Sequence, residues 1–278
     1  MQESKMIHLH ISTRLKYAKS KMAHQWKVPM RHVERHYMYL LPAIDILDGK
    51  AVRLAKGDYA QVTVYNDDPV EQAKVFEDAG AEWIHMVDLD GAKTGQPVNI
   101  KIVERILANT NLKIEIGGGI RTLDVCARLA DAGASRMVLG TALVRDPDFA
   151  QAAIEEYGDM LAAGIDAKGG EVAVAGWREG SGVAATDLAR DMAALGYRHL
   201  VYTDIARDGM QTGIEREAYE RMAEAFGYPV IASGGVASMD DIARLAPVAA
   251  SIEGIITGRA IYEGTLPLEE AIRACKEA

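Results

Sequence analysis

The sequence predicts an α/β fold: a (β/α)8 barrel of the TIM type, built from two repeated half-barrels. From residue 38 onward, short apolar runs alternate with amphipathic segments, and this alternation repeats eight times. Eight strand-then-helix units in residues 38–278 match the size and rhythm of such a barrel. A doubly wound sheet is less favoured, because no GxGxxG turn follows the first apolar run.

The expected strands are short and mostly continuous apolar runs, which is typical of strands buried on both faces. They are residues 39–45, 84–88, 113–117, 137–140, 161–166, 199–204, 229–233 and 254–258.

The helices between these runs are predicted from their capping residues. Asp68-Pro69 and Asp146-Pro147 each place a capping carboxylate before a proline suited to the first helical turn. Thr186 and Ser238 are expected as further N-caps. The glycines expected where helices end are Gly80, Gly133, Gly158, Gly196 and Gly227.

An internal repeat divides the barrel into halves at about residue 158. AIDILDGKAVR (43–53) corresponds to GIDAKGGEVAV (164–174), and IHMVDLDGAKTG (84–95) corresponds to HLVYTDIARDGMQTG (199–213). GGGI (117–120) and LGTA (139–142) likewise return as SGGV and TGRA. Within this repeat Thr203 stands where the first half has Val87, which indicates that the second half acquired a chemical role there.

Charge and composition set limits on function. Residues 1–36 carry eight Lys and Arg against two Glu, so the remaining residues carry a net charge of −15. We expect residues 1–37 to be a basic extension outside the core and residues 38–278 to form the barrel. The acidic body argues against nucleic-acid binding, and no apolar run is long enough to span a membrane. We expect a cytoplasmic monomer.

The cysteines and histidines suggest no metal centre. Cys126 and Cys275 are far apart, which favours ordinary reduced thiols. No His, Cys and carboxylate cluster has metal-ligand spacing, so we predict no metal. His85 and His199 lie near the starts of expected strands, where a structural role is favoured.

Glycine-rich turns after four strands predict two phosphate sites at the carboxyl-terminal end of the barrel, where the active sites of this fold lie. Backbone N–H groups without side chains leave room for an anion. Because the turns recur with the repeat, they imply phosphates on opposite sides of one mouth. The residues are Gly118, Gly119, Gly140 and Thr141 in the first half, and Gly234, Gly235, Gly258 and Arg259 in the second.

Two aspartates are candidate acid–base catalysts. Asp45 ends the first expected strand and Asp166 ends the fifth, so the repeat places them across the mouth from one another. Such a pair can act as general base and general acid on a substrate between them. Asp88 and Asp208, with other nearby aspartates, are comparably suited to shaping loops or contacting substrate hydroxyls.

The chain from about Tyr39 to its end resembles the histidine-biosynthesis isomerase family that acts on ProFAR, phosphoribosylformimino-aminoimidazole carboxamide ribotide. The motifs that carry the resemblance are PAIDILDGKAVRL with GDY, IEIGGGIR, VLGTALV, GIDAKGG, VYTDIARDGMQTG, VIASGGV and IITGRAIYEG. The resemblance implies a small-molecule substrate with a phosphate at each end. It also implies an Amadori rearrangement of an aminoaldose to an aminoketose, without a cofactor.

The resemblance also suggests roles for individual residues. Asp45 would remove the proton from ribose C2′, Asp166 would protonate the ring oxygen, and Thr203 would bind the opened sugar or steer Asp166. Arg121, after the triple-glycine turn, would face a phosphate or the carboxamide. Trp177, in a glycine-flanked loop, would close over the aminoimidazole ring.

Three alternatives stay open. The chain could also isomerise phosphoribosyl anthranilate in tryptophan synthesis, because the chemistry is identical. It could be the related cyclase, although that enzyme has Cys before Leu-Asp-Val where this chain has Pro42-Ala43-Ile44-Asp45. A non-catalytic barrel that binds a diphosphorylated ligand belongs to a different class.

Overall fold

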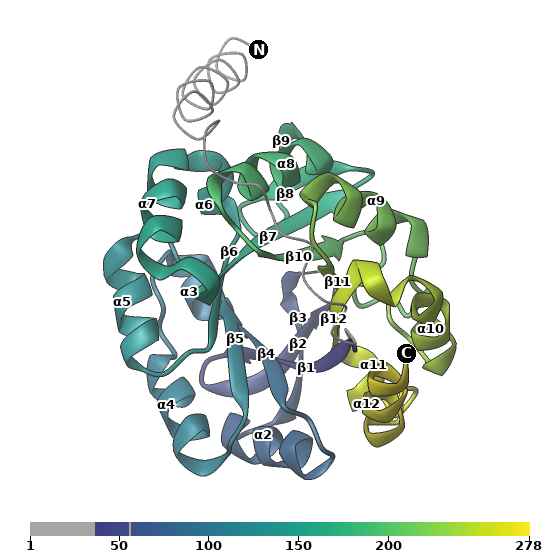
Figure 1. Ribbon diagram of the computed structural model, residues 1–278. Helices are drawn as coiled ribbons and strands as arrows, with labels where there is room; N and C mark the ends of the chain where they lie inside the picture. The colour runs from purple at the N-terminus through teal and green to yellow at the C-terminus, as the bar shows by residue number, and fades with distance from the viewer. Residues whose placement is uncertain (1–36, 56) are drawn as a thin grey trace. The chain divides into compact units, whose positions relative to one another are not determined.

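Eight parallel strands form a closed barrel in the computed structural model, which describes residues 37–55 and 57–278. Each strand pairs with two parallel neighbours, and the barrel closes where β7 meets β10. Figure 1 shows helices arranged around these strands. In order around the barrel the strands are β1 (Tyr39–Leu47), β4 (Trp83–Asp88), β5 (Lys113–Gly117), β6 (Arg136–Leu139), β7 (Leu161–Lys168), β10 (His199–Asp204), β11 (Val230–Ser233) and β12 (Ile252–Thr257).

The predicted barrel is therefore confirmed, and the ends of all eight predicted strands agree with the structure to within two residues. The expected extension, residues 1–37, lies outside the described residues apart from Tyr37, and its role stays a prediction.

Four further strands were not predicted from the sequence. β2 (Lys50–Ala55) pairs antiparallel with β1, and β3 (Asp58–Asn66) pairs antiparallel with β2. In the same way β8 (Glu171–Val174) pairs antiparallel with β7, and β9 (Glu179–Ala184) with β8. Much of β3 and β9 is exposed, so these segments lack the continuous apolar pattern of the barrel strands. The two hairpins occupy the same place in each half, after the strands that carry Asp45 and Asp166.

Most of the predicted helix starts are confirmed. The Asp68 carboxylate accepts a hydrogen bond from Val70 N, and Asp146 accepts one from Phe149 N. Ser238 forms a capping box with Asp241. The prediction for Thr186 is wrong: β9 runs directly into the helix, which begins at Ala185, so Thr186 lies within the first turn.

The longer helices that surround the barrel each place one apolar stripe against the strands. They are α2 (Pro69–Asp78), α4 (Ile100–Asn109), α5 (Leu123–Asp131), α7 (Pro147–Tyr157), α8 (Ala185–Leu195), α9 (Arg216–Phe226), α10 (Met239–Leu245) and α12 (Leu268–Glu277). Shorter helices are α3 (Leu89–Thr94), α6 (Thr141–Arg145) and α11 (Arg259–Tyr262), and the 3-10 turns are η1 (Gly158–Met160) and η2 (Ala246–Ser251).

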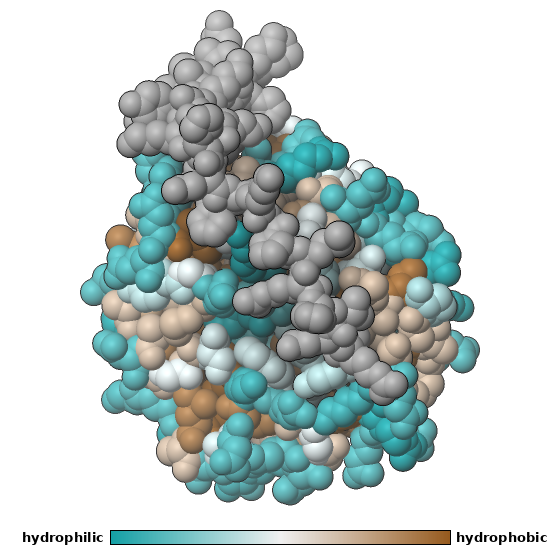
Figure 2. All heavy atoms as spheres, in the orientation of Figure 1, coloured by the Kyte–Doolittle hydropathy of each residue, from teal (hydrophilic) through white to brown (hydrophobic). Residues whose placement is uncertain are grey.

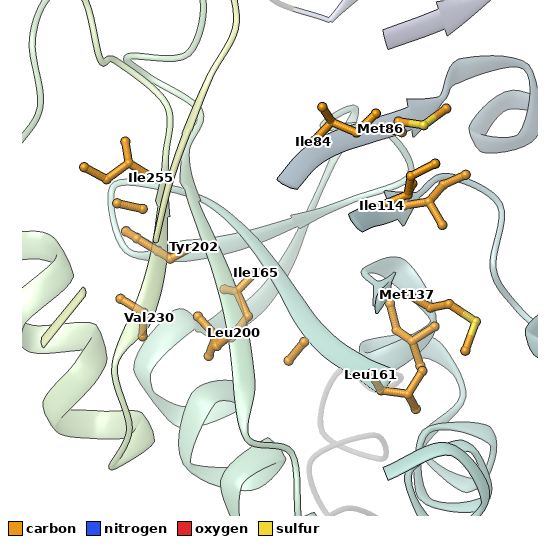
Figure 3. Packing of buried hydrophobic residues seen from close by; sticks show 14 of the residues in the cluster. Ile84, Met86, Ile114, Met137, Leu161, Ile165, Leu200, Tyr202, Val230 and Ile255 are labelled. Atoms are coloured by element: carbon orange, nitrogen blue, oxygen red, sulfur yellow. The ribbon is translucent and has the colours of Figure 1, made fainter. Parts of the chain in front are cut away.

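The hydrophobic core has two parts, because successive strand residues point to opposite faces. Side chains such as Ile84, Met86 and Ile165 point outward and pack in the large cluster shared with the helices (Figure 3). A smaller cluster fills the barrel interior and consists of Leu41, Ala43, Ala162, Val201, Ile231 and Ile256. On the outside, Figure 2 shows mostly hydrophilic residues around the rim of one face, with small hydrophobic groups between them.

Cys126 and Cys275 are both buried, and neither forms a disulfide, as expected. Within residues 37–55 and 57–278, no helix has the length and apolar character needed to cross a membrane.

Candidate active site

One cavity of about 290 Å³ lies at the carboxyl-terminal ends of the strands, and side chains or backbone from all eight barrel strands line it. The structure brings every site residue predicted from the sequence to this cavity. They are Asp45, Asp166, Thr203, Gly118, Gly119, Gly140, Thr141, Gly234, Gly235, Gly258, Arg259, Arg121 and Trp177.

Asp45 forms a largely buried ion pair at one side of the cavity. The Arg53 guanidinium donates from Nη1 to Asp45 Oδ2 at 2.7 Å. Arg53 comes from β2, and its guanidinium occupies the space that a side chain on Gly258 would need. Sequence reasoning missed Arg53, although it stands within the repeated motif 43–53. The ion pair holds the Asp45 carboxyl group in place at the wall of the cavity.

Asp166 is enclosed by groups that hold its carboxyl in place. Trp177 donates from Nε1 to Asp166 Oδ2 at 2.8 Å, and Thr203 stands beside Asp166 in the parallel register of β7 and β10. Burial raises the pKa of Asp166, while hydrogen bonds from Trp177 and Thr203 and the charge of nearby His85 offset part of that rise. A carboxyl group with a raised pKa is suited to donate a proton.

A third aspartate, Asp208, also lines the cavity, on the turn after β10. The pKa of Asp208 is raised, mainly by burial. The charge of Arg53 offsets part of this rise, and the nearby carboxyl groups of Asp45 and Asp166 add to it. The sequence had left Asp208 open between loop shaping and substrate contact. Its place in the cavity makes it a second candidate for the acid.

The glycine pairs in the two halves make equivalent close contacts. Gly118 has a φ of +105°, and a side chain there would collide with the backbone of Asp88; Gly234 has a φ of +89° and would collide with the backbone of Asp204. Both positions therefore require glycine. Each pair leaves the cavity wall without side chains. That a phosphate binds at each pair stays a prediction.

The outer residues of the two predicted phosphate sites differ in their partners. The Thr141 hydroxyl accepts a hydrogen bond from Ala175 N at 3.1 Å, which ties it to the turn that carries Trp177. Arg259 donates from Nε to Glu263 at 2.6 Å and from Nη1 to the Gly209 carbonyl at 2.7 Å. The Arg259 cation is thus oriented across the mouth of the cavity.

Arg121 lies against Gly95, where an added Cβ would come within 2.5 Å of Arg121 Nη1. The glycine that ends the first copy of the repeated motif therefore makes room for a cation that faces the cavity. In the second copy Gly213 also leaves room for neighbouring side chains, because a Cβ there would meet Arg244 and Asp241 at about 3 Å, but Arg244 does not line the cavity.

Two residues missed or discounted by sequence reasoning, Tyr59 and His85, also line the cavity. Tyr59 is on the unpredicted strand β3 and donates a hydrogen bond to the Leu89 carbonyl at 2.9 Å. Across the described residues, no group of three or more His, Cys, Asp or Glu is arranged to hold a metal ion.

Comparisons with known proteins agree with this geometry. The model of the family described as "Histidine biosynthesis protein" matches residues 39–267. A protein of Mesorhizobium japonicum is 50% identical over 236 residues, which cover 84% of this chain and 96% of that protein. A protein of Sinorhizobium fredii is 49% identical over 245 residues, covering 87% of this chain and 100% of that protein. Both are named 1-(5-phosphoribosyl)-5-((5-phosphoribosylamino)methylideneamino)imidazole-4-carboxamide isomerase.

Proposed function

The chain belongs to the histidine biosynthesis protein family, and on this basis we propose that it is the isomerase that converts ProFAR, an aminoaldose, into the aminoketose PRFAR. The observation that carries the proposal is the placement of Asp45 and Asp166 in one cavity between two equivalent glycine pairs. The relatives are named for this isomerase alone, so neither a second activity on phosphoribosyl anthranilate nor a non-catalytic role gains support.

The substrate is held by its two ends. One phosphate binds at Gly118 and Gly119 with Gly140 and Thr141, and the other at the corresponding turns of the second half with Arg259. Arg121 contacts the first phosphate or the carboxamide. Trp177 covers the aminoimidazole ring and excludes water, which strengthens the electrostatic interactions within the cavity.

The two aspartates then catalyse the rearrangement. Asp166 gives a proton to the ring oxygen of the ribose, which opens the ring and leaves an iminium at C1′. Asp45 removes the proton from C2′, which gives an enaminol with a C1′–C2′ double bond. The protonated Asp45 returns this proton to C1′ while the C2′ hydroxyl gives its proton back to the Asp166 carboxylate, which leaves the ketone at C2′. The ion pair with Arg53 holds the Asp45 carboxyl group in position, and the raised pKa of Asp166 favours the protonated form that an acid needs. Thr203 holds Asp166 in position.

The reaction requires no cofactor in this scheme. We further propose that the protein acts as a cytoplasmic monomer on this small-molecule substrate, with no nucleic acid or membrane partner. Gel filtration of the purified protein tests whether it is a monomer.

Turnover of ProFAR by variants tests the proposal. We expect Asp45→Asn and Asp166→Asn each to lower kcat by about 10²- to 10⁴-fold, while product still binds because the phosphate sites are unchanged. Asp67→Asn, which changes a side chain that is 81% exposed, is the matched control. Near-normal kcat in both active-site variants would refute the acid–base assignment.

The same assay decides between the two candidate acids. If Asp166 is the acid, Asp208→Asn should retain more activity than Asp166→Asn. The reverse order would transfer the role to Asp208.

A further inference from the structure

A network of polar side chains crosses the barrel interior one layer below the cavity. Glu115 is fully buried and points into the barrel two residues before Gly117, which lines the cavity. Its Oε2 accepts from Arg136 Nη1 at 3.1 Å, and Arg136 Nη2 donates to Glu253 Oε1 at 2.9 Å. His199 Nδ1 lies 2.9 Å from Glu253 Oε2 at the far side of the network.

His85 joins this network to the active site. Its Nδ1 lies 2.7 Å from Glu115 Oε1, and its ring also lines the cavity. The charge of His85 lowers the pKa of both Asp166 and Asp208, although burial is the larger influence and raises each of them. The imidazole therefore connects a fully buried carboxylate to the cavity that holds the candidate acids.

The internal repeat shows that the barrel does not need these polar residues to fill its interior. At the offset that relates Val87 to Thr203, His85 corresponds to Val201 and Glu115 corresponds to Ile231. Val201 and Ile231 belong to the apolar cluster inside the barrel. Because buried charges are costly unless paired, a polar pair at two positions that are apolar in the other half indicates a purpose other than packing.

We propose that Glu115 is a positioning residue of the active site, which acts on the acid–base groups by fixing the ring of His85. This inference rests on the proposed isomerase function. A carboxylate only accepts hydrogen bonds, so it holds the proton on His85 Nδ1 and directs Nε2 to the cavity. Arg136 orients the Glu115 carboxyl group through the hydrogen bond from its Nη1.

The test is a double-mutant cycle with Glu115→Gln and His85→Asn, read as kcat and KM for ProFAR. We expect Glu115→Gln to lower kcat about tenfold, the size typical of losing a hydrogen bond to a charged group, with little change in KM. In the His85→Asn background, Glu115→Gln should lower kcat no further. If the two effects multiply independently, Glu115 does not act through His85 and the proposal is wrong.

Glu253→Gln is the matched control, because Glu253 also pairs with Arg136 but contacts His199 in place of His85. We expect its kcat to stay within about twofold of wild type, even where its melting temperature falls. An equal loss of kcat in Glu253→Gln and Glu115→Gln would show a general structural effect and overturn the proposal. If Glu115→Gln does not fold, Glu115→Asp keeps the charge beside Arg136, withdraws it from His85 and should show the same loss of kcat.

A second readout does not depend on activity. The ¹⁵N chemical shifts of the His85 ring should show a protonated Nδ1 in the wild-type protein and a changed ring state in Glu115→Gln. Unchanged shifts would overturn the proposal. A wild-type protein that does not convert ProFAR would refute the proposed function, while the ring shifts would still decide whether Glu115 controls His85.

Discussion

Replacing Asp88 by Asn should destabilise the protein far more than its small change in shape suggests. Asp88 ends β4, is 1% exposed, and accepts four hydrogen bonds. Oδ1 accepts from Gly91 N and Asn99 Nδ2, both at 2.8 Å, and Oδ2 accepts from Val98 N at 2.7 Å and Asn99 N at 2.9 Å. In Asn one of these oxygens becomes an NH₂ group, so two donors lose their acceptor.

The magnitude follows from the two donors left without a partner. An unsatisfied buried donor costs about 1–3 kcal/mol, so the free energy of unfolding should fall by about 2–6 kcal/mol. This is a large part of the roughly 5–15 kcal/mol that stabilises a typical domain. The turn that Asp88 holds also packs its backbone against Gly118, so we expect the KM for ProFAR to rise as well.

Urea unfolding, followed by circular dichroism and extrapolated to water, measures the loss. Asp67→Asn makes the same change at an exposed site and should alter stability by no more than about 0.5 kcal/mol. A loss below about 1 kcal/mol in Asp88→Asn would refute the reasoning. If activity fell while stability did not, Asp88 would be a substrate ligand and not a residue that shapes the turn.

Two further predictions concern pH and glycine. Burial raises the pKa of Asp166 in the folded protein above the ordinary value of about 3.9 that it has in the unfolded chain. The folded protein therefore loses stability as the pH rises from the unfolded pKa through the folded pKa. Asp166→Asn should therefore melt at a higher temperature than wild type at pH 7 and lose this advantage below about pH 4; a pH-independent difference would contradict it. Gly234→Ala should cost at least about 1–3 kcal/mol, since it combines a φ of +89° with a Cβ only 2.6 Å from the Asp204 carbonyl oxygen. Gly227→Ala is the control, because Gly227 has a φ of +80° but open space around it, so this variant measures the backbone strain alone. Equal losses of stability in the two variants would show that the collision at Gly234 adds nothing.

The repeat explains why so many residues of the candidate site could be located from the sequence. In a parallel barrel, the residue that ends each strand must face the same end, so Asp45, Asp166 and Thr203 could be placed together before any contact was known. The paired glycines could be assigned in the same way. Their φ values, and the backbone atoms against which they pack, confirm that no other residue fits at Gly118 and Gly234.

The sequence by itself determined the barrel, its two halves and the residues at its mouth, because these depend on periodicity and on strand direction. Only the tertiary structure showed that Arg53 pairs with Asp45, that Trp177 bonds to Asp166, and that the ring of His85 connects Glu115 to the cavity. These contacts join residues on different strands or hairpins, and no local sequence pattern indicates which side chains meet. The polar side chains involved are stable in the interior only because the closed barrel brings their partners within hydrogen-bond distance.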